Sequence, residues 1–433
     1  MYDRLKGFRD RYPREMEAHR RVIDVVEDVA RRYGFREIGT PAMERTALYV
    51  EKSGEEVVED LYAFTDQGGR EVALAPELTP TVARMVAERG QELAKPIKWY
   101  STRPFWRYED TQQGRSREFY QTNVDVLGSD DPAADAEIMA VAAESLLDLG
   151  LDPGDFEFRV SHRDILSELL ETVEPSVDTR AAIRAVDKRA KIDEAEYVSL
   201  LTEAGLTASQ AQEFDDLIAT DDLDAVAGFG GPELADAVEN LRAVLSAAAD
   251  FGVREHCTVS LRTARGLDYY TGVVFECFDA EGEIGRAVFG GGRYDDLVEG
   301  LGGPPTPAVG FAPGVMNSTL PLLLQRAGAW PAESLHTDYY VLQVGDTRET
   351  AARIAADLRD RGHVVETDVA GRSFGAQLEY ADSVGAETTV IVGEQDLADG
   401  MVTVKDMDSG DQTRVAVESF PGDRERPTYA DLA

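Results

Sequence analysis

The stretch Pro104–Gly128, PFWRYEDTQQGRSREFYQTNVDVLG, decides the fold that we expect for the chain. It predicts two β-strands joined by a short polar loop, DTQQGRSR (110–117). Because side chains alternate between the two faces of a strand, one face is apolar, from Trp106 to Val126, and the other is largely polar. The second face carries Arg107, Glu109, Phe119, Gln121, Asn123 and Asp125.

The polar face of this hairpin, with Arg115 and Arg117 in the loop, is a candidate ligand site. Arginine side chains hold phosphates and carboxylates through paired N–H groups, and an aromatic ring among them suits a ring-bearing anion such as a nucleotide. The residues leave a second interpretation open, in which the polar side chains cover a solvated sheet face.

Composition places the chain among soluble multidomain proteins. Its 433 residues suffice for two or three domains, each with its own core. No run of 18 apolar residues occurs, and the charged start MYDRLKGFRDRYP is unlike a signal peptide, so we expect a cytoplasmic protein without a membrane segment. Cys257 and Cys277 lack metal-ligand spacing, which favours a reduced setting without structural zinc.

Acidic residues are in large excess along the whole chain. The 82 Asp and Glu against 44 Lys and Arg give a net charge of −38, while a hydrophobic content of 43% argues against disorder. This balance indicates adaptation to high salt, where screening weakens the repulsion between carboxylates. It also argues against a broad basic surface for nucleic acid.

The net negative charge should make the thermal stability of the protein depend on salt. We expect the melting temperature to rise as KCl is raised from low to molar concentration, because the repulsion that opposes folding is screened. Thermal melts followed by circular dichroism measure the effect, with a sucrose series as the uncharged control. A melting temperature that is highest at low salt would rule out salt adaptation.

Periodicity divides the chain into four parts. Residues 1–162 and 251–328 alternate helical and strand patterns, and are predicted to form an α+β core with an antiparallel sheet flanked by helices. Residues 163–250 carry only short helical patterns, broken by Pro and Gly, which predicts a helical insertion. Residues 334–433 alternate strands and helices and are predicted to form a compact α/β domain with a mixed sheet.

A second candidate motif is LRTARGLDYYTGVVFECF (261–278), which places Arg265, Tyr269 and Tyr270 just before an apolar strand. The alternative is a turn capped by Asp268, with both tyrosines in an ordinary core. No G-x-S-x-G or H-E-x-x-H motif occurs, and the five histidines show no metal-ligand spacing, so we expect them to be structural or exposed.

Two glycine-containing segments follow. FGGGRYD (289–295) is neither a P-loop nor a dinucleotide fingerprint, and a simple hinge is its alternative. Residues 304–314 are predicted to lead into a helix at about Val315–Leu324, whose N-terminus could offer backbone N–H groups to phosphate.

Together these motifs resemble those of the histidyl-tRNA synthetases, a family of class II aminoacyl-tRNA synthetases. RGLDYYTG and GGGRYD are highly specific for the family, whereas the Arg107–Glu109 hairpin is common to the class. The resemblance covers nearly the whole chain and rests on KGFRD (6–10), APELTP (75–80), FWRYE (105–109), GRSREFYQTNVDVLG (114–128), ARGLDYYTGVVFE (264–276) and GGGRYDDL (290–297).

The resemblance implies that the core is catalytic and that the part from Ser334 is an anticodon-binding domain. It implies activation of L-histidine by ATP with Mg²⁺, transfer to the 3′ end of tRNA-His, and a homodimer whose interface includes Pro41. Arg265 and Arg107 would be the catalytic arginines. The residues implied to bind ATP are Arg107, Glu109, Arg115 and Phe119. Those implied to bind histidine are Glu77, Leu78, Thr79, Arg107, Gln121, Asp125, Arg265, Tyr269 and Tyr270.

One departure concerns the third class motif, which normally ends in a Glu-Arg pair with its arginine on the γ-phosphate. The matching stretch, Gly310–Thr319, has Met316 and Asn317 at those positions. The change leaves two other functions open: a non-catalytic histidine-binding paralogue, such as the regulatory subunit of ATP phosphoribosyltransferase, and a tRNA-binding adaptor. In the enzyme, phosphate binding would depend more heavily on Mg²⁺, the helix N-terminus and Arg107, Arg115 and Arg265.

Overall fold

The structure is a computed structural model whose described residues form two compact units. One unit contains His19–Pro331 with the first ten residues, and the other contains Arg11–Ala18 with the part from Ala332 onward. Each has its own sheet and core. The described residues are 2–50, 59–220, 222–265 and 267–419.

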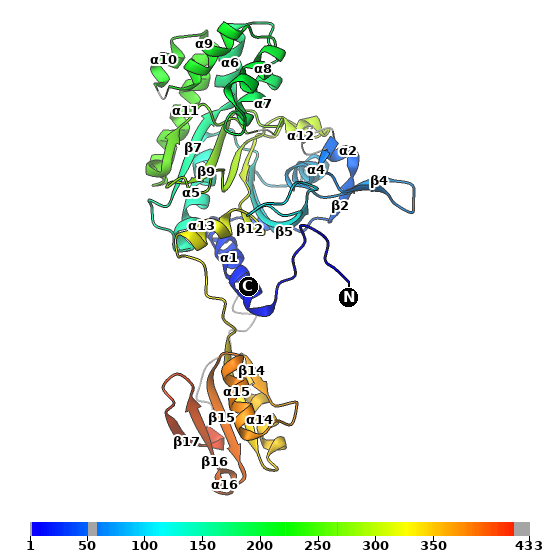
Figure 1. Cartoon of the computed structure of the whole chain (residues 1–433), viewed down its shortest axis with the longest axis vertical. Coiled ribbons are helices and arrows are strands. Elements are labelled where there is room, and N and C mark those ends of the chain that lie inside the picture. The colour runs from blue at the N-terminus through cyan, green and yellow to red at the C-terminus, as the bar shows by residue number, and fades with distance from the viewer. Residues whose placement is uncertain (1, 51–58, 221, 266, 420–433) are drawn as a thin grey trace. The chain divides into compact units, whose positions relative to one another are not determined.

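A nine-stranded sheet, counted over the described residues, is the centre of the first unit (Figure 1). In sheet order its strands are β1 (Arg36–Glu37), β5 (Ile97–Trp106), β6 (Glu118–Leu127), β11 (Ala308–Phe311), β10 (Phe289–Arg293), β9 (Val273–Asp279), β7 (Phe156–His162) and β8 (Cys257–Val259), with β12 (Gly314–Met316) also on β6. Strands β5 and β6 form the predicted antiparallel hairpin, in register from Ile97↔Leu127 to Trp106↔Glu118. Only the edge pairs β1–β5 and β7–β8 of this sheet are parallel in the described part.

Helices cover both faces of this sheet. Val124 and Val126 of β6 pack in one core with α1 (Pro13–Arg32), α5 (Pro132–Asp148) and α11 (Pro232–Asp250). Phe119 and Leu127 pack in a second core with α4 (Thr79–Arg89). Neighbouring residues of β6 therefore enter opposite cores, which is the alternation that the sequence predicts.

Residues 163–250 are helical wherever the structure describes regular elements. Figure 1 shows α6–α10 grouped at one end of the first unit, with α11 leading back to the sheet. The helices preceding α11 are α6 (Arg163–Val173), α7 (Thr179–Lys188), α8 (Glu194–Glu203), α9 (Ala208–Ile218) and α10 (Leu223–Ala227). The smaller elements of the first unit are β2 (Met43–Arg45), α2 (Thr46–Val50), β3 (Ala63–Thr65), β4 (Glu71–Leu74), η1 (Arg254–His256), α12 (Leu297–Gly300) and α13 (Leu320–Arg326).

The second unit has the predicted mixed sheet. Its strands, in sheet order, are β14 (Val365–Thr367), β13 (Thr337–Val344), β15 (Ala386–Gly393), β16 (Met401–Asp406) and β17 (Gln412–Ala416). The first three are parallel, and β16 and β17 add an antiparallel hairpin. Val341 packs towards α14 (Arg348–Asp360), whereas Tyr340 and Leu342 pack towards α15 (Phe374–Ser383), so helices cover both faces. The remaining elements are α16 (Glu394–Ala398) and η2 (Val417–Ser419).

Two local predictions were wrong. Strand β5 ends at Trp106, so Arg107 and Glu109 lie in the connection. The Arg107 N–H still donates to the Arg117 carbonyl, but the Arg117 N–H donates to the Gly7 carbonyl instead of returning to Arg107. Helix α13 begins at Leu320 rather than Val315, because residues 314–316 pair with β6 as β12. Pro321 then lies in the first turn of the helix, where its missing N–H is tolerated.

Part of the predicted organisation lies outside what the structure tests. The domain boundaries at 162, 250 and 334 stay predictions, and residues 420–433 of the predicted C-terminal domain lie outside the described residues. Each described helix is too short or too polar to span a lipid bilayer.

Candidate active site

Two adjoining cavities lie on the polar face of the hairpin. The outer cavity has a volume of about 350 Å³, and the inner one a volume of about 50 Å³. Arg107, Gln121 and Arg265 line both, so the two cavities meet at a pair of arginines.

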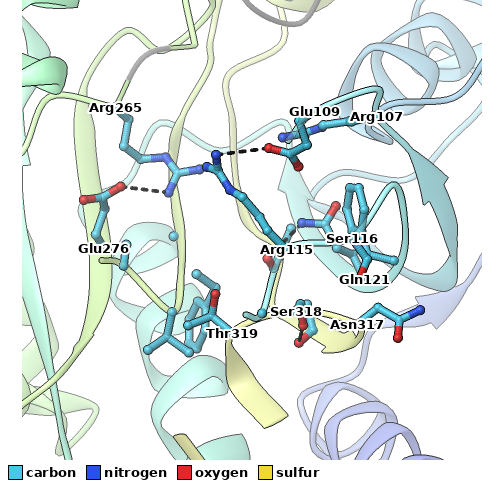
Figure 2. Close-up of a pocket in the computed structure, with 18 of the residues that line it drawn as sticks. Arg107, Glu109, Arg115, Ser116, Gln121, Arg265, Glu276, Asn317, Ser318 and Thr319 are labelled. Carbon is cyan, nitrogen blue, oxygen red and sulfur yellow. Dashed lines mark hydrogen bonds and ion pairs between the residues drawn. The ribbon is translucent and has the colours of Figure 1, made fainter. Parts of the chain in front are cut away.

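The outer cavity brings together all four residues that the resemblance assigns to ATP: Arg107, Glu109, Arg115 and Phe119. Nη1 of Arg115 lies 3.1 Å from Oε2 of Glu109. The Arg107 guanidinium lies 5.4 Å from the centre of the Phe119 ring, and its Nε donates to the Pro76 carbonyl at 3.0 Å. Figure 2 shows Arg115 paired with Glu109 and Arg265 paired with Glu276.

The inner cavity contains most of the residues assigned to histidine. Its lining includes Glu77, Thr79, Arg107, Gln121, Asp125, Arg265, Tyr269 and Tyr270. Leu78 is the exception, because its side chain is buried in the core beside α4 and is not part of the lining in the described structure.

Burial decides between the interpretations that the sequence left open. Asn123 and Asp125 are only 4% and 3% exposed, so the solvated sheet face is wrong. Tyr269 and Tyr270 are not merely core residues, because both line the inner cavity and the Tyr269 hydroxyl donates to Oε2 of Glu77 at 2.7 Å. Oε1 of Glu77, Oδ1 of Asn123 and Nε of Arg265 are buried without a hydrogen-bond partner among the described residues. Such groups commonly await a ligand or an ordered water.

Arg265 occupies a backbone conformation that a side chain rarely adopts. Its φ of +50° is in the left-handed region, at a cost of about 1–2 kcal/mol. Nη1 of buried Arg163, the first residue of α6, donates to the carbonyls of Ala264 and Arg265, both at 3.0 Å. These bonds hold the strained segment, and the Arg265 guanidinium lies 3.5 Å from Oε1 of Glu276. Strain that is held in place at a cavity wall indicates function.

The glycine run is a buried strand and not a hinge. Residues 290–292 belong to β10 and pair with β9 and β11. A Cβ on Gly290 would clash with the Arg265 guanidinium, and one on Gly292 would lie 2.9 Å from the Tyr270 ring. Gly310 of β11 has the same role beside the Asp125 carboxylate. The glycines therefore make room for the polar side chains of the site.

Asp125 is the most deeply buried acid of the inner cavity. Its Oδ1 accepts a hydrogen bond from the Tyr294 hydroxyl at 2.6 Å. Burial raises the pKa of Asp125 to about 7, although the Tyr294 hydrogen bond opposes this shift.

This shift predicts how stability depends on pH. An acid whose pKa is higher in the folded state stabilises the fold fully below its ordinary pKa of 3.8, and that contribution is lost as the pH rises towards 7. Asp125→Asn removes the titrating group and therefore the decrease in the free energy of unfolding that accompanies its ionisation, which amounts to at most about 4 kcal/mol. We therefore expect the melting temperature of Asp125→Asn minus that of the unsubstituted protein to increase from pH 5 to pH 7.5, without ligand and at constant KCl. A constant difference would contradict the assignment.

Sequence reasoning gave no role to four residues at the site. Tyr294 follows Gly290 and Gly292 on the same strand face, and that alternation was the available signal. Glu276 ends the motif ARGLDYYTGVVFE, but a carboxylate there has no distinctive spacing. Asp187 and Lys191, from the end of α7 and beyond, line the outer cavity, and no pattern in the sequence indicates this.

The third-motif region offers no arginine to the site. Asn317 has a φ of +59°, and its Nδ2 donates to the carbonyl of Glu118 at 3.0 Å. Ser318 and Thr319 line the outer cavity just before α13. Within the described residues, no group of three or more His, Cys, Asp or Glu side chains could hold a metal ion.

Two protein families match most of the chain. The family model "Histidyl-tRNA synthetase" matches residues 7–317, and the model "Anticodon binding domain" matches residues 338–422. A protein from Haloarcula marismortui named "Histidine--tRNA ligase" is 67% identical, and the alignment covers 100% of both chains. A protein of the same name from Natronomonas pharaonis is also 67% identical over 100% of both.

Solved structures agree with these matches. The histidyl-tRNA synthetase from Nostoc sp. PCC 7120 aligns with a TM-score of 0.79 and 26% identity, covering 96% of this chain and 97% of that one. A structure titled as an ATP phosphoribosyltransferase regulatory subunit/histidyl-tRNA synthetase, from Bacillus halodurans C, has a TM-score of 0.75 at 22% identity. Its likeness extends to the fold alone, so it does not favour the paralogue. The family model and the full-length relatives show that this chain belongs to the histidyl-tRNA synthetase family.

Proposed function

We propose that the chain activates L-histidine with ATP, releasing pyrophosphate, and transfers the histidyl group from the adenylate to the 3′ end of tRNA-His. The observation that carries the proposal is the junction of the two cavities at Arg107 and Arg265. A nucleotide in the outer cavity and an amino acid in the inner one would meet at these arginines.

The chemistry at that junction needs charge stabilisation more than proton transfer. A carboxylate oxygen of histidine forms a bond to the α-phosphorus of ATP, and the bond to the pyrophosphate oxygen breaks. Negative charge accumulates at the α-phosphate, where the guanidiniums of Arg107 and Arg265 would stabilise it. No general base is required, since the nucleophile is already ionised.

Histidine selection would follow from the polar lining of the inner cavity. Glu77, Thr79 and Gln121 would bind the α-amino group, while Asp125 and the two tyrosines would surround the imidazole. An amino acid without ring nitrogens would leave Asp125 with only the Tyr294 hydrogen bond in a buried site, and the free energy of the missing hydrogen bond gives strong discrimination.

ATP would lie with its adenine on Phe119 and near Glu109, and with its phosphates towards Arg115. Binding of the phosphates by Arg115 requires its guanidinium to leave Glu109, to which it is paired here. Mg²⁺ usually takes one or two carboxylates together with phosphate oxygens. Glu276 and Asp187 are carboxylates of the wall that suit this role, and the ion would neutralise charge on the outer phosphates.

A homodimer in the cytoplasm is part of the proposal. By the resemblance, residues 34–41 match the first of the class II sequence motifs, and the two residues that follow are exposed in the single chain, with Met43 47% exposed. Pro41, Ala42 and Met43 are exposed in succession, and such a contiguous apolar surface suits an interface with a second copy. Light scattering at high KCl would measure the mass.

The proposed function is tested by charging of tRNA. We expect radiolabelled histidine to become attached to purified tRNA-His in the presence of ATP, Mg²⁺ and KCl, and not to a tRNA for another amino acid. Attachment to neither tRNA, or to both equally, would contradict the proposal.

A further inference from the structure

The wall of the outer cavity carries no net positive charge for the outer phosphates of ATP. Its lining includes four carboxylates and four cations, and three of those cations are already paired. The pairs are Arg115–Glu109 at 3.1 Å, Lys191–Asp187 at 3.5 Å and Arg265–Glu276 at 3.5 Å. With position 317 occupied by an asparagine bonded to Glu118, the site needs a cation from elsewhere.

Asn317 also does not face the paired arginines. Figure 2 shows its amide pointing away from Arg115 and Arg265. Its φ of +59° is a backbone conformation that asparagine adopts more readily than arginine, so an arginine at this position would strain the backbone.

Arg286 lies where such a cation could act. It belongs to the connection between β9 and β10, directly before Ala287, which lines the outer cavity. Its Nη2 donates to the Gln113 carbonyl, and the same nitrogen lies 2.7 Å from the position of a Cβ on Gly114. Gly114 lines the cavity, immediately before Arg115. The Arg286 guanidinium therefore packs against the tip of the β5–β6 connection, next to the lining residues Gly114 and Ala287, although Arg286 is not itself part of the lining of the described cavity.

The same corner contains the start of the third-motif helix. A Cβ on Gly114 would lie 3.3 Å from the carbonyl oxygen of Ser318, and Ser318 and Thr319 line the cavity. Arg286 thus approaches, from another segment, the region from which the third-motif arginine would have extended.

The surroundings of Arg286 suit an anion. Within the described residues it forms no ion pair with a carboxylate, and its Nε is buried without a hydrogen-bond partner. Burial lowers the pKa of Arg286 and nearby Arg115 lowers it further, while Glu109 opposes the shift. Two neighbouring guanidiniums repel each other, and a phosphate that binds both would relieve the repulsion.

We propose that Arg286 takes the place of the missing third-motif arginine and, with Arg115, binds the outer phosphates of ATP and the pyrophosphate product. This inference rests on the proposed function for the identity of the nucleotide. It assigns Arg286 to phosphate binding and not to histidine or adenine recognition.

The test compares ATP with AMP, which lacks the outer phosphates. For Arg286→Ala, calorimetry at high KCl with Mg²⁺ is expected to show ATP binding weakened about tenfold to a hundredfold, as for a lost charge-assisted hydrogen bond, with AMP binding changed less than twofold. The KM for pyrophosphate in the reverse reaction should rise in parallel, and the KM for histidine should not. Arg286→Lys should recover part of the loss.

Two matched variants complete the experiment. Arg70→Ala removes an exposed arginine that pairs with Asp66 outside the cavity, and should leave ATP binding unchanged. Lys191→Ala tests whether ATP binding depends instead on Lys191, a cation of the outer cavity that belongs to none of the family motifs. The proposal would be overturned if Arg286→Ala weakened the binding of ATP and AMP equally. It would also be overturned if Lys191→Ala, and not Arg286→Ala, weakened ATP binding.

The result stays interpretable in two further cases. Should Arg286→Ala fail to fold, as judged by its melting temperature, Arg286→Gln keeps the length of the side chain, and the same outcomes apply to it. The calorimetry needs no histidine, so an absence of histidine activation would contradict the proposed function and leave the ATP–AMP comparison as the test of Arg286.

Discussion

Replacing Arg265 by alanine is expected to slow histidine-dependent ATP–pyrophosphate exchange about a hundredfold to a thousandfold, as for the loss of one transition-state contact. Its guanidinium lies in the walls of both cavities, where the carboxylate and the α-phosphate would meet. The Arg265 side chain is only 19% exposed, so water replaces the lost charge poorly. The glycine at 290 and the strained backbone at 265 both serve to place this one side chain.

Controls separate this effect from a loss of folding. Arg262→Ala removes an arginine of the same segment that pairs with Asp215 and lines neither cavity. It should lower the rate of ATP–pyrophosphate exchange less than tenfold. Arg265→Ala leaves the partly buried Glu276 without its cation, so the double variant Arg265→Ala/Glu276→Gln checks that an unpaired carboxylate is not the cause. If the exchange rate fell less than tenfold in both Arg265 variants while their melting temperatures were unchanged, the proposed transition-state role of Arg265 would be contradicted.

Asp125→Ala is expected to weaken histidine binding by about 3 kcal/mol or more, which corresponds to over a hundredfold in Kd. The substitution removes the acceptor for an imidazole N–H in a site that water hardly reaches, since Asp125 is 3% exposed. It also leaves the Tyr294 hydroxyl without the acceptor that it has here. Calorimetric titration with L-histidine at high KCl measures the change.

Asp125→Asn is the matched control for that experiment. It keeps the shape and one carbonyl acceptor, so its Kd should lie between those of Asp125→Ala and the unsubstituted protein. ATP binding should be unaffected in both variants, because Asp125 lines only the inner cavity. Unchanged histidine binding in Asp125→Ala would refute the assignment.

The spacing of apolar residues predicted the fold well where a segment shows only the two-residue repeat of a strand or only the helical repeat. The hairpin of β5 and β6 and the strands of the second unit follow from runs of apolar residues whose spacing matches the observed elements. The prediction of element ends failed where contacts between distant segments set the end of a strand or the start of a helix. Strand β5 stops at Trp106 because the Arg117 N–H donates to the Gly7 carbonyl instead of to Arg107, and α13 begins at Leu320 because the preceding residues pair with β6 as β12.

The candidate site was predictable in its motifs and not in its surroundings. Arg107, Asp125, Arg265 and the tyrosines belong to recognisable segments, and the structure brings them together around two cavities. Arg286, by contrast, belongs to no motif. Its position depends on how the connection before β10 packs on the β5–β6 connection, which no local pattern in the sequence specifies.

Histidine-dependent ATP–pyrophosphate exchange tests the central claim most directly, because it requires activation and needs no tRNA. At high KCl with Mg²⁺, we predict that labelled pyrophosphate enters ATP when L-histidine is present, and not when it is omitted or replaced by phenylalanine. Binding of histidine without exchange would contradict the account and would indicate a non-catalytic histidine-binding protein.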